Sequence, residues 1–319
     1  IQESSKVMIM GHSNSDMDCI GASMGIYRLT KSLEKDAYLV LNPKGENLVT
    51  FLNEINGNSE YENLILEPQA AISEIDDDTL LVIVDTNKKN YVESPELLQK
   101  AKKIVVIDHH RRSPDYIENA MLTFHEVYAS SASELVTELV EYAQQEVTLT
   151  DLEAEALYAG IMMDTKSFTF KTGVRTFEAA AYLRKCGVDI IKVKKWFQSN
   201  LDTYNKISGI IGKAEIVYDS IAISVYEEED KDANIVCAKA ADELLTISNI
   251  TASFVLGKLD NKICISGRSI GDINVQVILE KLGGGGHITL AGAQVESTDI
   301  YEVKQELINR INEYFSEQI

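Results

Sequence analysis

Short apolar runs alternate with amphipathic stretches along the first half of the chain. Four runs, at residues 7–10, 37–41, 79–84 and 104–107, contain only four to six residues and are rich in β-branched side chains. Such runs, without polar alternation, are typical of parallel strands covered on both faces. Residues 20–33, between the first two runs, predict a helix. Strands that alternate with helices predict a doubly wound α/β sheet.

The hydrophobic spacing becomes helical from residue 131 to about residue 200. Ser131 and Glu134 have the spacing of a capping box, and residues 151–163 predict a further helix that ends at Asp164. Apolar runs and helical stretches alternate again in the last third of the chain. Strands are predicted over 214–226, 251–259 and 262–266, and helices over 233–245, 274–282 and 299–314.

These changes of pattern divide the chain into three parts. We predict a first domain over residues 1–190, a helical connector over 191–213 and a smaller domain over 214–319. The predicted fold class is therefore α/β: a doubly wound parallel-sheet domain, with a second, smaller α/β domain across a cleft.

Charge and cysteine content exclude several classes of protein. The 319 residues include 30 Lys and Arg against 50 Asp and Glu, a net charge of −20, which disfavours binding of long nucleic acids. The four Cys form no CxxC pair, as expected of idle thiols in a reducing compartment. No apolar run approaches the ~18–20 residues needed to cross a bilayer.

Polar clusters directly follow three of the predicted strands. In an open parallel sheet, ligands bind beyond the carboxyl ends of the strands, so residues far apart in sequence meet there. Acidic groups at the ends of buried strands are costly unless they are paired or bound to metal. The candidate residues are His12, Asp16 and Asp18 after the first strand, Asp85, the triplet Asp108-His109-His110, and Asp164 after the helix.

This mixture of carboxylate and imidazole ligands suits Mn²⁺, Mg²⁺ or Fe²⁺. So many carboxylates at one sheet edge would repel one another without cations. Two ions about 3.5–4 Å apart need a bridging carboxylate, and a water between them would be acidified to hydroxide and could attack phosphorus in line. We expect two divalent ions, and oxygen and nitrogen ligands alone do not choose among these three metals; Mn²⁺ is the first candidate only with the family resemblance given below.

A glycine run near the end of the chain suggests a second kind of site. Gly283 to Gly286 could expose consecutive backbone N–H groups to an anion, although a helix C-cap with a loop is the simpler explanation. His287, which follows the run, and the nearby Arg268-Ser269 favour a phosphate and nucleotide clamp, because Arg can bind a phosphate through two hydrogen bonds.

Several stretches together resemble a known family. GHSNSDMDCIG, VIVD, VIDHH and GGGGH resemble the four signatures of the DHH phosphoesterase superfamily with its DHH-associated C-terminal domain. VIDHHRR, YASSASELVTELVEY, GIMMDTKSF and SGRSIGDINVQVILEKLGGGGH are similar to the catalytic part of GdpP-type cyclic-di-AMP phosphodiesterases. The resemblance covers essentially the whole chain.

The resemblance implies a role for each candidate. It implies that Asp108 orients a ligand imidazole, and that His110 lies near the scissile phosphate, as charge stabiliser or proton donor. The implied first metal site is His12, Asp16 and Asp85; the second is Asp18, Asp85, His109 and Asp164, with Asp85 bridging; and Arg268, Ser269, Gly284, Gly285, Gly286 and His287 bind substrate. His125 is assigned no role.

The expected function is hydrolysis of cyclic-di-AMP to linear 5′-pApA by a metal-bridging hydroxide. The alternatives are a nanoRNase that releases AMP from pApA, a single-strand exonuclease, a manganese pyrophosphatase and a cyclic-dinucleotide receptor without turnover. The chain starts with Ile rather than Met, so we expect a fragment of a longer protein. The resemblance implies that it is the catalytic part, on the cytoplasmic side, of a membrane-anchored bacterial protein, and we expect no membrane contact by the fragment itself. A homodimer is compatible with the sequence, but no feature demonstrates one.

Overall fold

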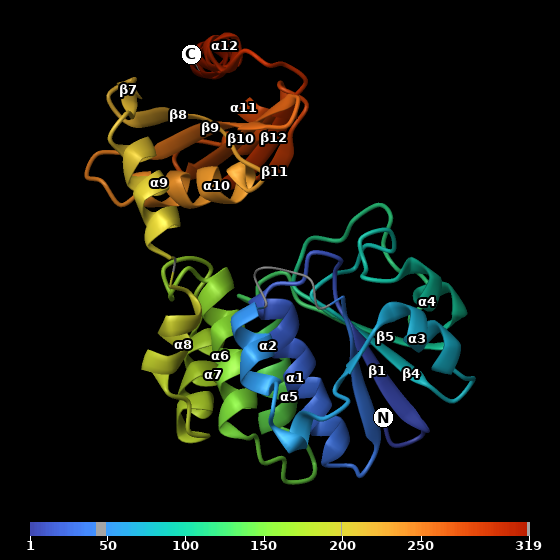
Figure 1. Ribbon diagram of the computed structural model, residues 1–319. Coiled ribbons are helices and arrows are strands. Elements are labelled where there is room, and N and C mark those ends of the chain that lie inside the picture. The colour runs from blue at the N-terminus through green and yellow to red at the C-terminus, as the bar shows by residue number, and fades with distance from the viewer. Residues whose placement is uncertain (43–48, 199, 318–319) are drawn as a thin grey trace. The chain divides into compact units, whose positions relative to one another are not determined.

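The computed structural model describes residues 1–42, 49–198 and 200–317 of the chain. The chain forms two compact units, Ile1–Gln198 and Ser199–Ile319, each with a sheet of its own (Figure 1). The predicted connector is divided between them, because its first helix belongs to the first unit and its second helix to the second.

The first unit is built on a six-stranded sheet in which every pair of neighbouring strands is parallel. The strand order is β3-β2-β1-β4-β5-β6. The chain therefore reverses its direction of growth between β1 and β4, which is where open parallel sheets bind ligands. The strands are β1 (Lys6–Met10), β2 (Asp36–Val40), β3 (Ile65–Leu66), β4 (Leu80–Val84), β5 (Lys103–Asp108) and β6 (Leu122–His125).

Helices cover both faces of this sheet, as the wholly apolar strands predict. Val7 and Ile9 of β1 face one buried cluster, whereas Met8 and Met10 face another. In Figure 1, α3 (Pro68–Glu74) and α4 (Pro95–Lys100) lie on one side and the other helices of this unit on the other. The predicted doubly wound sheet is thus confirmed. The helices on the second side are α1 (Met17–Lys31), α2 (Val49–Ile55), α5 (Ala132–Glu141), α6 (Asp151–Asp164), α7 (Val174–Lys185) and α8 (Ile190–Trp196).

Close packing around α1 depends on glycine. A Cβ at Gly21 would lie within 3 Å of the backbone of Ala156 on α6, and one at Gly160 of α6 would lie 2.9 Å from Cα of Asp18. These contacts bring α1, α5 and α6 close together at the carboxyl edge of the sheet. The helix that begins beside Asp18 is therefore fixed in place by its neighbours.

The second unit is a smaller α/β domain with a mixed sheet in the order β11-β12-β10-β9-β8-β7. Only β8 and β9 are parallel among its neighbouring pairs. Its helices pack through two buried clusters, one on each face. The elements are α9 (Leu201–Ile211), β7 (Glu215–Val217), β8 (Ile221–Glu229), α10 (Ala233–Leu244), β9 (Ala252–Leu259), β10 (Lys262–Ser269), α11 (Val275–Glu280), β11 (Gly285–His287), β12 (Leu290–Val295) and α12 (Ile300–Ser316).

One predicted strand, at residues 214–226, is wrong in detail. The structure divides it into β7 and β8, which pair as an antiparallel hairpin. Tyr218 and Asp219 make the turn with φ angles of 51° and 60°, a left-handed conformation that the apolar pattern does not encode. Among the described residues, no helix has the length and apolar character that crossing a membrane requires.

Candidate metal centre

Asp18 lies at the start of α1 and is fully buried. Its carboxylate accepts hydrogen bonds from the backbone N–H groups of Ala132 at 2.7 Å and Ser133 at 2.8 Å, which open α5. The N-terminus of a helix favours a negative charge, so α5 stabilises this carboxylate. Asp18 therefore orders a helix 114 residues away along the chain as well as serving as a candidate ligand.

Asp16 and His12 form the second part of the motif that follows β1. Oδ1 of Asp16 caps α1 by accepting from the N–H groups of Asp18 and Cys19, and Oδ2 of Asp16 lies 3.9 Å from Nε2 of His12. The ring of Tyr91 stacks on His12 with 5.3 Å between centroids and 3° between planes. The cap and the candidate ligand are thus two oxygens of one carboxylate.

Asp85 lies between the two groups of candidate ligands. Its Oδ2 is 3.3 Å from Nε2 of His12, and its Oδ1 is 3.3 Å from Nε2 of His109. The residue follows β4 with a φ of +59°, a conformation that costs energy for a residue other than glycine and recurs at functional sites. This arrangement presents one oxygen to each side.

His109 joins Asp85 to the helix end that carries Asp164. Nε2 of His109 lies 3.1 Å from Oδ2 of Asp164 and 3.8 Å from Oδ2 of Asp18. Asp164 is the last residue of α6, and its side chain is partly exposed. The six predicted metal ligands therefore meet at one edge, in the groups His12, Asp16, Asp85 and Asp18, His109, Asp164.

Asp108 and His110 lie beside this cluster. Oδ1 of the fully buried Asp108 pairs with Nδ1 of His110 at 2.8 Å, and the His110 ring is half exposed. Nδ1 of His110 is also 3.6 Å from Oδ1 of Asp85, so His110 could join a ligand group as well. Sequence reasoning missed two neighbours: Asn87, which donates to Asp108, and His125, whose Nε2 contacts the backbone oxygen of His110.

The packing of these charges shifts the pKa values of several groups. Burial raises the pKa of the Asp18 carboxyl well above its usual range, and the charges of Asp85 and Asp164 raise it further. Burial disfavours the imidazolium of His12, yet contacts with Asp16 and Asp85 raise its pKa to about 11.

Two further groups show the same balance. Burial opposes charge on His109, but contacts with Asp164 and Asp85 raise the pKa of its imidazole well above the usual range. Burial also opposes charge on Asp85, but His109 and His12 hold the pKa of its carboxyl below the usual range. The metal-free cluster therefore retains protons at neutral pH.

The donor set fits divalent metal ions. Oδ1 of Asp85 and Nε2 of His109 are buried, and neither has a hydrogen-bond partner within the part of the chain that the structure describes. Buried polar atoms normally have partners, so these two indicate a missing ligand. Carboxylate oxygens and imidazole nitrogens suit Mn²⁺, Mg²⁺ or Fe²⁺.

The predicted substrate residues all lie in the second unit, on or next to β10 and β11, the two strands that flank β12. Arg268 on β10 and His287 on β11 are both in register with Leu290 of β12, so they share one row and one face of the sheet. Arg268 pairs with Asp242 of α10 at 2.9 Å. Ser269 is buried, and its hydroxyl accepts from the N–H of Gly271.

The glycine run has structural duties of its own. The N–H groups of Gly283 and Gly284 donate to the carbonyls of Glu280 and Leu279 at the end of α11. A Cβ at Gly284 or at Gly286 would collide with backbone oxygens of β12, and Gly285 pairs with the same strand. The run therefore combines the helix cap with an edge strand.

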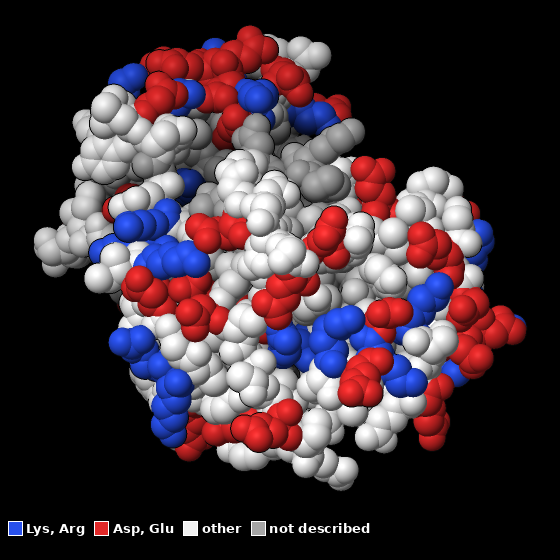
Figure 2. Space-filling model, turned by 60° about the horizontal axis from the view of Figure 1, so that its bottom comes forward, with Lys and Arg blue, Asp and Glu red and all other residues white. Residues whose placement is uncertain are grey.

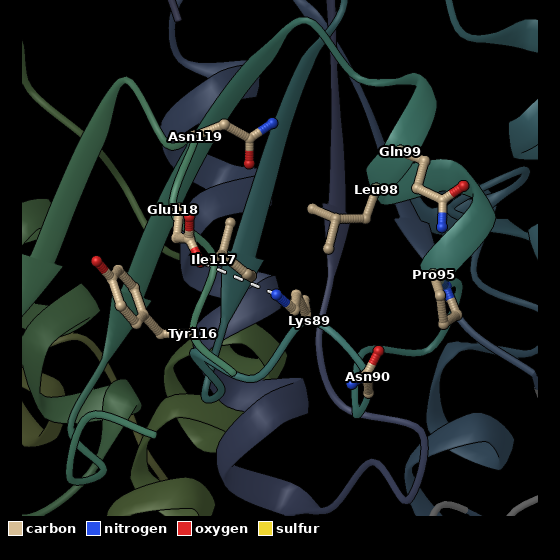
Figure 3. A pocket seen from close by; sticks show the side chains of 9 residues that line it. All are labelled: Lys89, Asn90, Pro95, Leu98, Gln99, Tyr116, Ile117, Glu118 and Asn119. Carbon is tan, nitrogen blue, oxygen red and sulfur yellow. Dashed lines mark ion pairs between the residues drawn. The ribbon is translucent and has the colours of Figure 1, made fainter. Parts of the chain in front are cut away.

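A pocket of about 450 Å³ lies between α4 and the loops that follow β4 and β5, and none of the predicted site residues lines it. Figure 3 shows Leu98 and Ile117 pointing toward each other, with Lys89 turned to Glu118, its partner at 3.9 Å. The N–H of Ile117 donates to the backbone oxygen of Asn87 at 2.9 Å, so the two loops are joined beside the metal centre.

Family models match both units. The model of the DHH family, N-terminal domain, matches residues 6–161, and the DHHA1 domain matches residues 217–317. The chain belongs to the DHH family. This DHH-family chain is similar in structure to an exopolyphosphatase-related protein from Bacteroides fragilis, with a TM-score of 0.81 at 20% identity over 98% of this chain and 93% of that one.

Three curated relatives are similar in sequence to this DHH-family chain. The cyclic-di-AMP phosphodiesterase GdpP of Geobacillus thermodenitrificans is 45% identical over 99% of the chain and 48% of the relative. The cyclic-di-AMP phosphodiesterase PdeA of Listeria monocytogenes is 41% identical over 99% and 48%. The bifunctional oligoribonuclease and PAP phosphatase NrnA of Mycoplasma genitalium is 28% identical over 98% and 95%. The chain thus spans about half the length of the first two.

Metal binding is expected to release protons. His12 and His109 have raised pKa values in the metal-free protein, so they are protonated at pH 7 and must become neutral to bind a metal. Metal affinity should therefore rise with pH, by about tenfold per pH unit for each proton released. Calorimetric titration of Mn²⁺ in buffers of different ionisation enthalpy measures the number of protons released on metal binding.

The variant His12→Ala should release fewer protons, whereas His287→Ala in the second unit should not change the number. Equal heats in all buffers would contradict the prediction.

Gly160→Ala is expected to disrupt the metal centre. The added methyl group would collide with Oγ of Ser133 and lie 2.9 Å from Oδ1 of Asp18, so Asp18 must move away from α5. We expect about 1–3 kcal/mol of lost stability and weaker Mn²⁺ binding. Gly209→Ala is the control: this helical glycine of α9 has open space around its Cβ position, and alanine there should stabilise by about 0.5–1 kcal/mol. Urea unfolding measures the stability of both variants, and metal titration measures their Mn²⁺ affinity. Unchanged metal affinity in Gly160→Ala would refute the role of the contact between Gly160 and Asp18.

Proposed function

We propose that this chain hydrolyses cyclic-di-AMP to linear 5′-pApA, using two divalent ions, with Mn²⁺ the first candidate. The observation that carries the proposal is the position of Asp85, whose two oxygens each lie 3.3 Å from an imidazole nitrogen of a different ligand group. A carboxylate shared between two groups is what a two-ion phosphodiesterase requires.

The protein groups divide the work around that centre. Two divalent ions held by these ligands would supply Lewis-acid activation of water and of the phosphoryl group. During hydrolysis a water oxygen bonds to phosphorus, and the bond from phosphorus to the 3′-oxygen breaks. Asp108 holds the Nδ1–H of His110, so the His110 imidazolium can give its Nε2 proton to that 3′-oxygen and become the neutral Nδ1–H imidazole. The phosphate stays on the 5′-oxygen, which yields 5′-pApA.

The second unit supplies the groups that recognise the nucleotide. Arg268 and His287 lie on one face of the mixed sheet and give it two groups that can bind an anion. Arg268 is held in place by Asp242, so it loses little freedom when it binds phosphate. We propose that both residues contact substrate phosphate, and that Ser269 and Gly284 to Gly286 shape the same surface.

The substrate assignment rests on relatives and on charge. The relatives named as cyclic-di-AMP phosphodiesterases are 41–45% identical, whereas the NrnA relative is 28% identical. The chain has a net charge of −20, and Figure 2 shows acidic side chains scattered over the whole face drawn, with basic ones between them. A small substrate with two phosphates suits such a surface better than a long nucleic acid.

The test of this proposal is hydrolysis of cyclic-di-AMP beside linear pApA, with Mn²⁺, with Mg²⁺ and with chelator. We expect metal-dependent formation of pApA with little AMP. Chromatography of the products measures both compounds. AMP formed mainly from pApA, with the cyclic substrate untouched, would instead support an NrnA-type activity. Binding of cyclic-di-AMP without any turnover would support a receptor.

Asp85→Asn should abolish hydrolysis, with a loss of about 10³-fold or more, because it removes the shared charge and keeps the shape. Asparagine tolerates the left-handed backbone at this position. Asp219→Asn is the matched control, because Asp219 is exposed and has a φ of 60°. Turnover retained in Asp85→Asn with metal present would remove this residue from the centre.

Arg268→Ala should mainly raise KM, by about 10–150-fold, since loss of one charged hydrogen-bonded contact costs about 1.5–3 kcal/mol of binding. Its kcat should change little, because the metal centre is intact. Lys262→Ala, which removes an exposed cation from the same strand, is the control. A KM equal to that of the unchanged protein would exclude Arg268 from substrate binding.

A further inference from the structure

Asn87 is buried two residues after Asp85, in the loop that follows β4. Its side-chain N–H groups donate to Oδ2 of Asp108 and, at 3.3 Å, to the backbone oxygen of Arg111. Its Oδ1 accepts from the N–H of Ser113 at 3.0 Å. The amide therefore uses both its donor and its acceptor ends inside the fold.

Asp108 links Asn87 to His110 by hydrogen bonds. Its Oδ2 is held by Asn87, while its Oδ1 accepts from Nδ1 of His110 at 2.8 Å and from the His110 N–H at 3.3 Å. Because Asp108 is fully buried, an oxygen without a donor would cost free energy, and the carboxylate would turn to find one. Both oxygens are thus fixed, and with them the plane of the His110 ring.

We propose that Asn87 is a positioning residue for the reaction, acting through Asp108 on His110. The carboxylate held by Asn87 fixes the Nδ1–H of the His110 ring, so that Nε2, which carries the proton to be donated when the ring is an imidazolium, faces the leaving oxygen in the required orientation. This inference rests on the role of His110 in the proposed hydrolysis.

The alternative is that Asn87 only holds its loop together. Its acceptor bond with Ser113 and the bond from Ile117 N–H to its backbone oxygen serve that purpose. The donor bond to Asp108 is separate from both. A variant that removes the donor and keeps the acceptor therefore separates the two roles: Asn87→Asp does so, whereas Asn87→Ala removes both ends.

The first experiment determines the tautomer of the His110 ring and requires no turnover. The chain has five histidines, so a long-range ¹H–¹⁵N spectrum of the metal-free protein can assign the ring of each. We expect the proton of neutral His110 on Nδ1 in the unchanged protein and a mixture of tautomers in Asn87→Ala and Asn87→Asp. Asn90→Ala and Asn90→Asp, on the exposed part of the same loop, should leave the spectrum of His110 unchanged. An unaltered His110 tautomer in both Asn87 variants would overturn the proposal.

The second experiment is a double-mutant cycle with His110→Ala, measured on whichever dinucleotide the protein hydrolyses. Asn87→Ala should lower kcat about 10–100-fold, the usual effect of losing a partner behind a functional group, with KM and Mn²⁺ affinity unchanged. In the His110→Ala background the same change should cost nothing further, because Asn87 acts through His110.

Each failure has its own signature. An equal loss of kcat in both backgrounds would show that Asn87 is structural, and so would a fall in metal affinity. Asn87→Asp gives the same reading should Asn87→Ala fail to fold. Absence of turnover in the unchanged protein would refute the proposed function, while the spectrum would still decide the role of Asn87.

Discussion

The structure depends on burying several carboxylates at the carboxyl edge of one parallel sheet. Asp18, Asp85 and Asp108 are almost wholly buried there, and an uncompensated buried charge costs several kcal/mol. Each is compensated differently: Asp18 by the N-terminus of α5, Asp85 by two imidazoles, and Asp108 by His110 and an amide. The helix starts and loops around the edge are arranged to meet these charges.

This arrangement couples stability to chemistry. Asp18 holds the first turn of α5 and is also a candidate ligand, and Gly160 allows α6 to approach it closely. The left-handed backbone of Asp85 places its carboxylate between two ligand groups. This conformation is strained, and the surrounding sheet must stabilise it. Within the described residues, Oδ1 of Asp85 and Nε2 of His109 have no hydrogen-bond partner, and divalent ions would satisfy both atoms.

In the second unit the electrostatic requirement is the opposite one: positive rather than negative charge has to be gathered at one place. A chain with a net charge of −20 must still bind an anionic substrate under the proposed function, so it has to concentrate positive charge locally. Arg268 and His287 fall in one row of the mixed sheet, on either side of Leu290, although 19 positions separate them in sequence. The glycine run keeps its strand close to β12 and so fixes His287 in that row.

The sequence by itself determined the doubly wound sheet and the set of acidic and imidazole residues at its edge. It could do so because unbroken apolar runs specify buried strands, and the residues that end parallel strands must meet. The split of β7 from β8, the cap that Asp18 gives to α5, and the contacts of Asn87 and His125 were decided only by tertiary structure. These features depend on left-handed turns and on contacts between segments distant along the chain, neither of which hydrophobic spacing encodes.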